Sequence, residues 1–251
     1  MAVAHLGSGD DWIRGNSGSK MSASKWGACT YMALPASGSD VGAISVFCKT
    51  ESYSTAERLK CWMRPTRCGV EAFAYGALEK LCIPSPRMVA FGERRWLGFP
   101  LQTLIVTAEV ERSETLKQFA ENEWSSMELP QRRCVFNDIA DTLAGQLRRA
   151  HAQQFIHHDL KWRNVLVTKT PSGYQTFWID APRAAYWRLR KRRGRIVDLS
   201  DFASLAVAMT SKYDRMRFML RYLGPGRSPG EAARFCRAID LRLERRKSRG
   251  K

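Results

Sequence analysis

Residues 155–167 read Phe-Ile-His-His-Asp-Leu-Lys-Trp-Arg-Asn-Val-Leu-Val. Polar side chains gather in the middle of this stretch, between a helix-like segment before it and a short β-branched run after it. Asp159 and Asn164 lie five residues apart, and Lys161 lies between them. A short loop of this kind directs a carboxylate, an amide and a cation toward one spot. The simplest alternative is an exposed polar turn whose Asp and Asn cap nearby backbone groups.

This spacing resembles the catalytic loop of protein kinases, H-R-D-L-x-x-x-N. His157 takes the His position, where it supports the loop, and His158 replaces the Arg. Phosphoryl transfer needs a carboxylate that orients the attacking hydroxyl and accepts its proton, and it needs oxygen ligands for Mg²⁺ on the nucleotide phosphates. The resemblance therefore implies that Asp159 and Lys161 are catalytic and that Asn164 binds metal. Lys161 would steady the charge on the moving phosphoryl group.

A second acidic residue follows at the distance that kinases use. Val165–Thr168 and Tyr174–Ile179 are predicted as two strands of a hairpin, and residues 171–173 as its turn. Asp180 ends the second strand, twenty-one residues after Asp159. Kinases place the Mg²⁺-binding Asp of D-F-G at such a strand end. We therefore expect Asp180 to be the second metal ligand, with an ordinary strand-end Asp as the alternative.

The N-terminal half predicts a lysine that holds the nucleotide phosphates. Lys25–Leu34 and Val41–Thr50 have the composition of strands, separated by a Pro-, Ser- and Gly-rich turn at residues 35–40. The second strand carries Lys49 near its end, as in the kinase motif V-A-I-K. The Gly15–Gly18 segment before these strands resembles the glycine-rich loop over the phosphates only weakly.

A helix is predicted over Thr66–Leu81, where apolar residues recur every three or four positions: Val70, Phe73, Ala74, Ala77, Leu78 and Leu81. Glu71 lies beside this stripe, twenty-two residues after Lys49. That is the place of the helix αC Glu that pairs with the phosphate-binding lysine. Glu79 is the rival, and a solvated Glu is the alternative.

The linker between two lobes is predicted at residues 108–110. Arg87–Phe91 and Gln102–Thr107 have the character of strands. Glu109 follows the second of them, at the position where backbone groups of a kinase hinge meet the adenine. Glu109 is therefore a further candidate for nucleotide binding.

The second lobe is predicted to be mainly helical. Thr115–Phe119 and Glu121–Trp124 begin it, and a long helix over Arg132–Phe155 leads into the catalytic loop. Phe218–Leu223 and Glu231–Leu243 are predicted as its last helices.

A further helix is predicted to open at Ile196. In kinase-like folds an Asp at the start of this helix binds the backbone of the catalytic loop. Asp198 fits best and Asp201 is the alternate, while either could be a simple N-cap.

Composition and charge narrow the class of protein. The chain has 251 residues and a net charge of +17, which favours an acidic partner such as nucleic acid, an anionic membrane or a phosphorylated substrate. Basic residues concentrate at 183–195, where a kinase binds its acceptor, and at 242–251, predicted to be a disordered solubilising tail. The sequence shows no apolar run of about 18 residues and no signal peptide, so we expect a cytoplasmic protein. The seven cysteines show no C-x-x-C spacing, which excludes a zinc-finger pattern.

Two further stretches of the sequence resemble a known family. The stretch from Leu81 to Glu93 and the Trp-Ile-Asp-x-Pro-Arg run at 178–183 resemble the bacterial lipopolysaccharide core kinases, the Kdo/heptose kinase family. That resemblance implies transfer of phosphate from ATP, with Mg²⁺, to a sugar hydroxyl of the inner core at the cytoplasmic face of the inner membrane. Its partners would be ATP, the anionic glycolipid and, peripherally, the anionic membrane. The chain departs from protein kinases because it lacks D-F-G and A-P-E.

The sequence thus predicts an α+β, two-lobed protein-kinase-like fold with an antiparallel-sheet N-lobe and a mainly helical C-lobe. The expected boundaries are a flexible or Gly-rich start at 1–24, the N-lobe at 25–107, the hinge at 108–110 and the C-lobe with a basic tail at 111–251. A protein Ser/Thr kinase and a pseudokinase scaffold in envelope assembly remain alternatives. Nucleic-acid binding would rest on charge alone, and no specific nucleic acid is expected.

Overall fold

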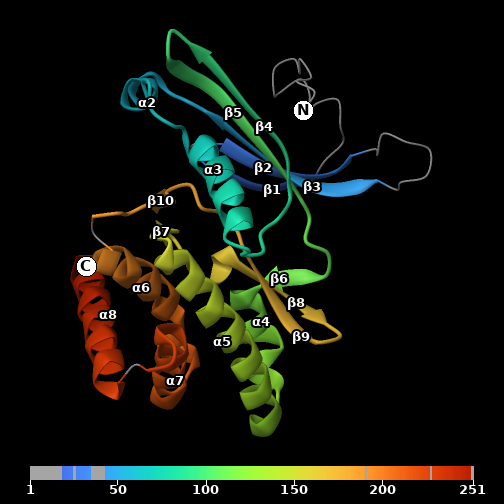
Figure 1. Ribbon diagram of the computed structural model, residues 1–251. Coiled ribbons are helices and arrows are strands. Elements are labelled where there is room, and N and C mark those ends of the chain that lie inside the picture. Colours follow the sequence, from blue (N-terminus) through green and yellow to red (C-terminus); the bar gives the residue numbers. More distant parts are fainter. Residues whose placement is uncertain (1–18, 25–26, 35–42, 190, 227, 250–251) are drawn as a thin grey trace. The chain divides into compact units, whose positions relative to one another are not determined.

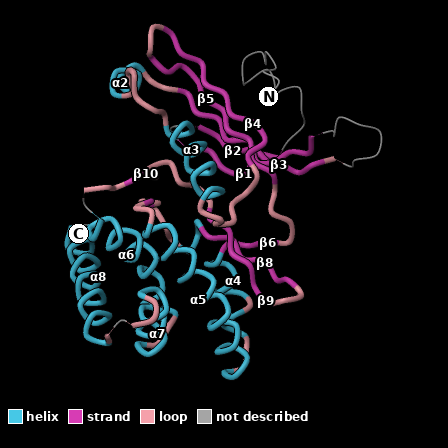
Figure 2. Tube along the Cα trace, in the orientation of Figure 1, coloured by secondary structure: helices cyan, strands magenta, loops and turns pink. Residues whose placement is uncertain are grey.

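The computed structural model describes residues 19–24, 27–34, 43–189, 191–226 and 228–249. The chain forms two compact units (Figures 1 and 2), which we describe separately. Unit 1 comprises residues 1–76 and 86–110, and unit 2 comprises residues 77–85 and 111–251.

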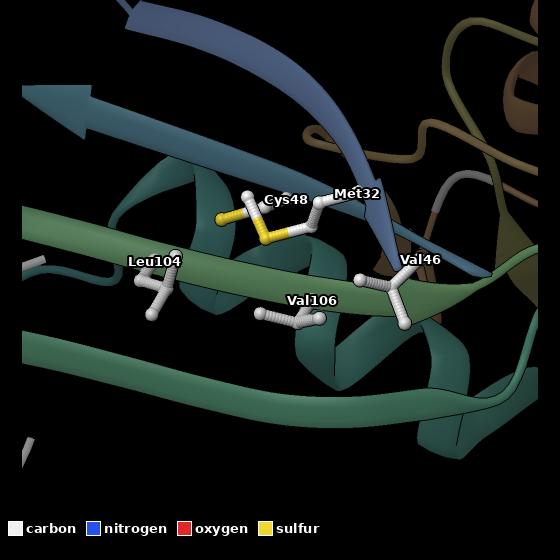
Figure 3. Packing of buried hydrophobic residues seen from close by; sticks show 5 residues of the cluster. All are labelled: Met32, Val46, Cys48, Leu104 and Val106. Atoms are coloured by element: carbon white, nitrogen blue, oxygen red, sulfur yellow. The ribbon is translucent and has the colours of Figure 1, made fainter. Parts of the chain in front are cut away.

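Unit 1 is built on a five-stranded antiparallel sheet with the strand order β1-β2-β3-β5-β4. Its strands are β1 (Ser19–Ser24), β2 (Gly27–Leu34), β3 (Ile44–Ser52), β4 (Met88–Trp96) and β5 (Phe99–Ala108). Successive side chains of a strand face opposite sides, so alternate residues of β2, β3 and β5 meet on one face. Figure 3 shows this core, formed by Met32, Val46, Cys48, Leu104 and Val106.

Two helices accompany this sheet in sequence, α2 (Thr55–Lys60) and α3 (Arg67–Lys80). The Thr66 hydroxyl accepts a hydrogen bond from the amide of Gly69 at 3.1 Å and so caps the start of α3. Ala74 is buried on α3, as its stripe predicted, but Phe73 is half exposed. The prediction for Phe73 was wrong because Glu71 and Tyr75, and not Phe73, occupy the buried face of this part of α3.

Unit 2 is mainly helical, with two small sheets, one of order β6-β8-β9 and the other pairing β7 with β10. Its helical elements are α4 (Leu116–Asn122), η1 (Trp124–Ser126), α5 (Leu129–Ala152), η2 (Trp162–Asn164), α6 (Lys191–Met209), α7 (Lys212–Leu223) and α8 (Pro229–Arg249). Its strands are β6 (Ser113–Thr115), β7 (Phe155–Ile156), β8 (Val165–Thr170), β9 (Gly173–Trp178) and β10 (Ala185–Tyr186). In the part of the chain that the structure describes, no helix is long and apolar enough to span a membrane.

A buried glutamine joins α5 to the β8–β9 hairpin. The Gln146 side chain is almost fully buried, and its Oε1 accepts hydrogen bonds from the Thr176 hydroxyl at 3.0 Å and from the indole N–H of Trp178 at 2.8 Å. Its Nε2 donates to the Thr176 carbonyl at 3.0 Å. Since Trp178 is fully buried, this network satisfies a polar group that would otherwise lack a partner in the core.

Several predicted boundaries in unit 2 were wrong, among them the start of α7, which lies at Lys212 and not at Phe218. The long helix α5 ends at Ala152, so Phe155 belongs to strand β7. Helix α6 begins at Lys191, five residues before the predicted start at Ile196, which places Asp198 inside the helix and rules out an N-cap role. The basic tail is helical as far as Arg249, and Arg246 forms an ion pair with the buried Asp201 of α6. Sequence composition does not reveal this pairing with a neighbouring helix.

Unit 1 contains two elements that the sequence did not predict, β1 and α2. Strand β1 falls within the stretch expected to be a flexible or Gly-rich start. Helix α2 begins with a capping box in which Ser54 and Glu57 satisfy each other's backbone groups. The Gly15–Gly18 loop and the turn at 35–40 lie outside the described residues.

The Gln146 network provides a test of the packing in unit 2. Replacing Gln146→Leu should lower the free energy of unfolding by about 2–4 kcal/mol, because the buried indole N–H of Trp178 and the Thr176 hydroxyl would lose their partner. Urea unfolding followed by circular dichroism measures this. Gln175→Leu is the matched control on exposed β9 surface and should change stability by less than about 0.5 kcal/mol. Equal effects of the two changes would contradict this account of the core.

Candidate active site

In unit 1, a lysine and a buried glutamate form an ion pair across 22 residues of sequence. Lys49 Nζ, on β3, lies 2.8 Å from Oε2 and 3.1 Å from Oε1 of Glu71, on α3. The Tyr75 hydroxyl donates to Glu71 Oε1 at 3.2 Å. Because the Glu71 side chain is 4% exposed and that of Lys49 is 30% exposed, the glutamate fixes the lysine from the protein side. Part of the Lys49 side chain remains exposed, and a lysine held by a glutamate in this way is typical of a phosphate-binding site. Glu79, the rival partner, is exposed.

Glu109 follows β5 and lies beside the sheet of unit 1. Its amide donates to the Ser45 carbonyl at 2.9 Å, and its carboxylate accepts a hydrogen bond from the Tyr31 hydroxyl at 2.9 Å. The backbone N–H of Glu109 is therefore already used within unit 1. The expectation that this residue contacts adenine stays a prediction.

The loop of unit 2 gathers the polar side chains that the sequence singled out. The Asn164 amide donates to the Asp159 carbonyl at 2.8 Å and to Asp159 Oδ2 at 3.2 Å. Lys161 Nζ lies 2.6 Å from Asp159 Oδ1. Asp159 and Asn164 are buried, whereas the Lys161 side chain is 31% exposed. A carboxylate, an amide and an ammonium group thus meet within hydrogen-bonding distance.

Asp198 of α6 holds this loop from beneath. Its Oδ2 accepts the amide N–H of His157 and its Oδ1 accepts that of His158, each at 2.8 Å. His151 Nε2 lies 3.2 Å from Oδ2. Burial by itself raises the pKa of Asp198, but the hydrogen bond and charge of His151, together with the loop amide, outweigh it and hold the pKa below its usual range. The carboxylate is therefore ionised, and it accepts two amides whose orientation fixes the start of the loop.

His157 connects the loop to the strand that leads to Asp180. Its Nε2 lies 3.2 Å from the carbonyl oxygen of Ile179. Since a carbonyl only accepts, Nε2 carries the proton in this bond. Burial lowers the pKa of His157 below its usual range, which keeps the imidazole neutral.

The amide of Ile179 in turn donates to the Asn164 carbonyl at 3.0 Å. The backbone preceding Asp180 is therefore bonded to both ends of the loop. Asp180 itself has φ of 56°, a left-handed conformation that Asp tolerates better than most residues and that is common at functional sites.

The side chains of the loop suit a magnesium ion. Because the Asn164 side-chain nitrogen donates to Asp159, its oxygen would be the ligand, and Asp180 would supply a carboxylate. Mg²⁺ prefers such oxygen ligands and usually takes one or two protein groups along with water and substrate phosphates. Within the described ranges, no group of three or more His, Cys, Asp or Glu side chains is arranged to hold a metal alone. The assignment of Asn164 and Asp180 to Mg²⁺ stays a prediction.

Two arginines also lie near Asp159, one from the loop and one from the basic cluster at residues 183–195. Arg163 and Arg183 each place Nη2 3.6 Å from an oxygen of Asp159. Arg183 Nη2 also donates to the His158 carbonyl at 3.3 Å. Both side chains are more than half exposed. The carboxylate is thus approached through a positively charged surface that suits an anionic substrate.

Sequence analysis missed three residues that shape this site. His151 is buried and links Asp198 to the Tyr222 hydroxyl, which lies 2.8 Å from Nδ1. Its position four residues after Leu147, on the apolar face of α5, could have indicated burial. No role at Asp159 was expected for Arg183, and nothing in the local sequence indicated the contact of Tyr222 with His151.

Comparisons with known proteins identify the family and the fold. The family model described as "Lipopolysaccharide kinase (Kdo/WaaP) family" matches residues 55–222. The structure is similar to that of WaaP in complex with acyl carrier protein, with a TM-score of 0.71 and 19% identity over 95% of this chain and 91% of that chain. It also matches the BubR1 kinase domain over 67% of this chain and 46% of that chain, at 16% identity and a TM-score of 0.45 that is too low to carry an argument. No curated protein sequence matches the chain.

The predicted kinase-like fold, an antiparallel N-terminal sheet followed by a helical C-terminal part, is thereby confirmed. The resemblance recognised in the sequence is confirmed as well, because the family model covers most of the chain. The chain belongs to the lipopolysaccharide kinase (Kdo/WaaP) family.

Proposed function

We propose that this protein transfers the γ-phosphoryl group of ATP to a sugar hydroxyl of the lipopolysaccharide inner core, on Kdo or heptose. The observation that carries the proposal is the loop in which Asp159 is held by Asn164 and Lys161 and anchored by Asp198. Membership of the lipopolysaccharide kinase family supports the class of substrate.

Asp159 would orient the acceptor hydroxyl and accept its proton. The hydroxyl oxygen forms a bond to the γ-phosphorus, and the bond between that phosphorus and the bridging oxygen of ADP breaks. Lys161, 2.6 Å from Asp159, lies where its charge can stabilise the oxygens of the transferring group. Asn164 and Asp180 would hold Mg²⁺, which when bound neutralises phosphate charge.

Lys49 would bind the nucleotide phosphates, with Glu71 fixing its position. Its side chain is the partly exposed member of the pair, and Glu71 would keep it in place while it binds an anion. Glu109 would contribute to adenine binding.

The net charge of +17 supports an anionic acceptor presented at the cytoplasmic face of the inner membrane. Each Lys or Arg near an anionic bilayer contributes about 1 kcal/mol of attraction. Assays with labelled ATP on purified core oligosaccharide and on protein substrates separate this function from that of a protein Ser/Thr kinase. Binding of ATP without turnover on either acceptor would instead indicate a pseudokinase. Mass spectrometry of the core from a deletion strain would identify the acceptor by the phosphate that is lost.

Asp159→Ala should lower kcat for core oligosaccharide by at least about a hundredfold, because it removes the group that receives the proton. Binding of ATP with Mg²⁺, measured by calorimetry, should remain largely unchanged. Asp141→Ala, a change at an exposed carboxylate on α5, is the matched control and should leave turnover as it is. Turnover of the Asp159 variant at the parent rate would refute its assignment.

Lys49→Met should weaken ATP binding by at least about tenfold, because it removes a phosphate contact and leaves the buried Glu71 carboxylate without its cation. The same change at the exposed Lys80, at the end of α3, controls for loss of charge. Calorimetric titration with ATP measures both. An unchanged affinity in the Lys49 variant would exclude this lysine from the nucleotide site.

Asp198→Asn should reduce kcat and lower the free energy of unfolding by about 3 kcal/mol, because an amide cannot accept both loop N–H groups. Since Asp198 acts by positioning the loop, KM for ATP should change little. Asp201→Asn, a change at another buried carboxylate of α6, should have the smaller effect on kcat. If instead Asp201→Asn alone impaired turnover, the alternate assignment would be correct.

A further inference from the structure

One end of unit 1 exposes a cluster of large apolar side chains. It comprises the end of α2, the turn that follows it and the loop of the β4–β5 hairpin, which lie side by side (Figure 1). The exposed residues, which we call the tip surface, are Leu59, Trp62, Met63, Trp96 and Leu97. Met63 is 74% exposed and Leu97 is 72% exposed. Soluble proteins rarely expose apolar side chains in a contiguous group unless the group contacts a partner or a membrane.

Specific bonds hold the two segments of the tip surface together. The Trp62 indole donates to the Leu97 carbonyl at 3.2 Å, and its ring stacks on Phe99 with centroids 5.9 Å apart. The Met63 amide donates to the Gly98 carbonyl at 3.3 Å. A Cβ atom on Gly98 would lie 2.7 Å from the Met63 sulfur, so the two segments are in close contact here.

Arg95 forms hydrogen bonds to both segments of the tip surface. Its guanidinium donates to the Gly98 carbonyl at 2.7 Å and to the Arg64 carbonyl at 2.6 Å. The same group donates to Glu93 at 2.8 Å. The apolar side chains are therefore presented by a rigid support.

The hairpin loop places a leucine where the backbone favours a polar residue. Trp96 pairs with Phe99, and Leu97 and Gly98 between them have φ of 48° and 85°. Positive φ at both loop residues is typical of a type I′ turn, for which Asn-Gly is the preferred sequence. Met63 also has positive φ, at 54°. Local conformational preference therefore does not account for the two most exposed apolar side chains of the tip surface.

The charges around the tip surface are predominantly positive. Lys60, Arg64 and Arg94 are exposed beside it. The acidic residues of these segments are engaged within the protein, because Glu57 completes the capping box of α2 and Glu93 pairs with Arg95. An apolar centre with a basic rim complements an anionic lipid surface, where Trp settles at the interface and Lys and Arg reach the headgroups.

We propose that the tip surface docks onto an anionic lipid bilayer, with Trp96, Leu97 and Met63 inserting into the interfacial region and the basic rim contacting lipid phosphates. The rim charge and the Trp content favour a bilayer over a second protein surface. This docking is independent of phosphoryl transfer, because it requires neither ATP nor an acceptor and can be measured without them.

The test measures partitioning of the full chain onto vesicles of phosphatidylglycerol and phosphatidylethanolamine, and onto phosphatidylcholine vesicles. Vesicles with brominated acyl chains report insertion, since bromine quenches tryptophan fluorescence. The parent protein should bind the anionic vesicles and be quenched. Trp96→Thr with Leu97→Asn should weaken partitioning by about tenfold and reduce quenching, because less apolar surface leaves water.

Matched changes separate insertion from charge. Tyr213→Ala removes an exposed aromatic from α7 of unit 2 and should behave like the parent. Replacing Lys60, Arg64 and Arg94 with Gln should lower affinity for anionic vesicles by about fivefold per residue. Asn is favoured at the first position of this turn, so Leu97→Asn alone should fold. This single variant replaces the double variant in the test if the double variant is unstable.

Three outcomes would overturn the proposal. The first is a parent chain that does not bind anionic vesicles. The second is a folded variant of Trp96 and Leu97 that partitions and is quenched like the parent. The third is a parent chain that is dimeric in solution and becomes monomeric on the same changes, which would assign the tip surface to a second copy.

Discussion

The carboxylate of Asp198 is the constraint on which the loop of unit 2 depends. It is fully buried, and removing an ionised carboxylate from water costs several kcal/mol. Two amides of the loop and His151 offset this cost, since hydrogen bonds to a charged group are worth about 1.5–3 kcal/mol each. The amides can meet the carboxylate only when residues 157 and 158 adopt one backbone conformation, which for His158 has φ of 66°. The position of Asp159, directly after them, follows from this arrangement.

Unit 1 also contains a buried carboxylate that needs a partner, the side chain of Glu71. Glu71 is buried and needs a cation, and Lys49 satisfies it while keeping part of its side chain in solvent. In each unit a buried carboxylate serves as the fixed point, and the group that would meet the substrate is held by it. A side chain positioned in advance loses little conformational freedom when it binds a ligand, so these ion pairs would favour binding of an anionic nucleotide.

The basic residues of unit 2 have two different roles. Some basic residues are structural, as Arg246 is with Asp201. Others, such as Arg163 and Arg183, lie around Asp159 with more than half of their side chains exposed. A high net charge is therefore a poor guide to function by itself, because sequence does not distinguish a cation paired with a buried carboxylate from one presented to a substrate.

The sequence by itself determined the elements with strong local signals: the β8–β9 hairpin, helix α3 and the spacing of Lys49, Glu71, Asp159, Asn164 and Asp180. Periodicity and turn residues are local properties, and phosphoryl transfer permits few residue types. Only the tertiary structure decided which acidic residue of α6 meets the loop, that His151 and Tyr222 lie behind it, and that the basic tail is helical. These outcomes depend on contacts across 40 or more residues, as between His158 and Asp198, and local sequence contains no record of which distant partner will satisfy a buried charge.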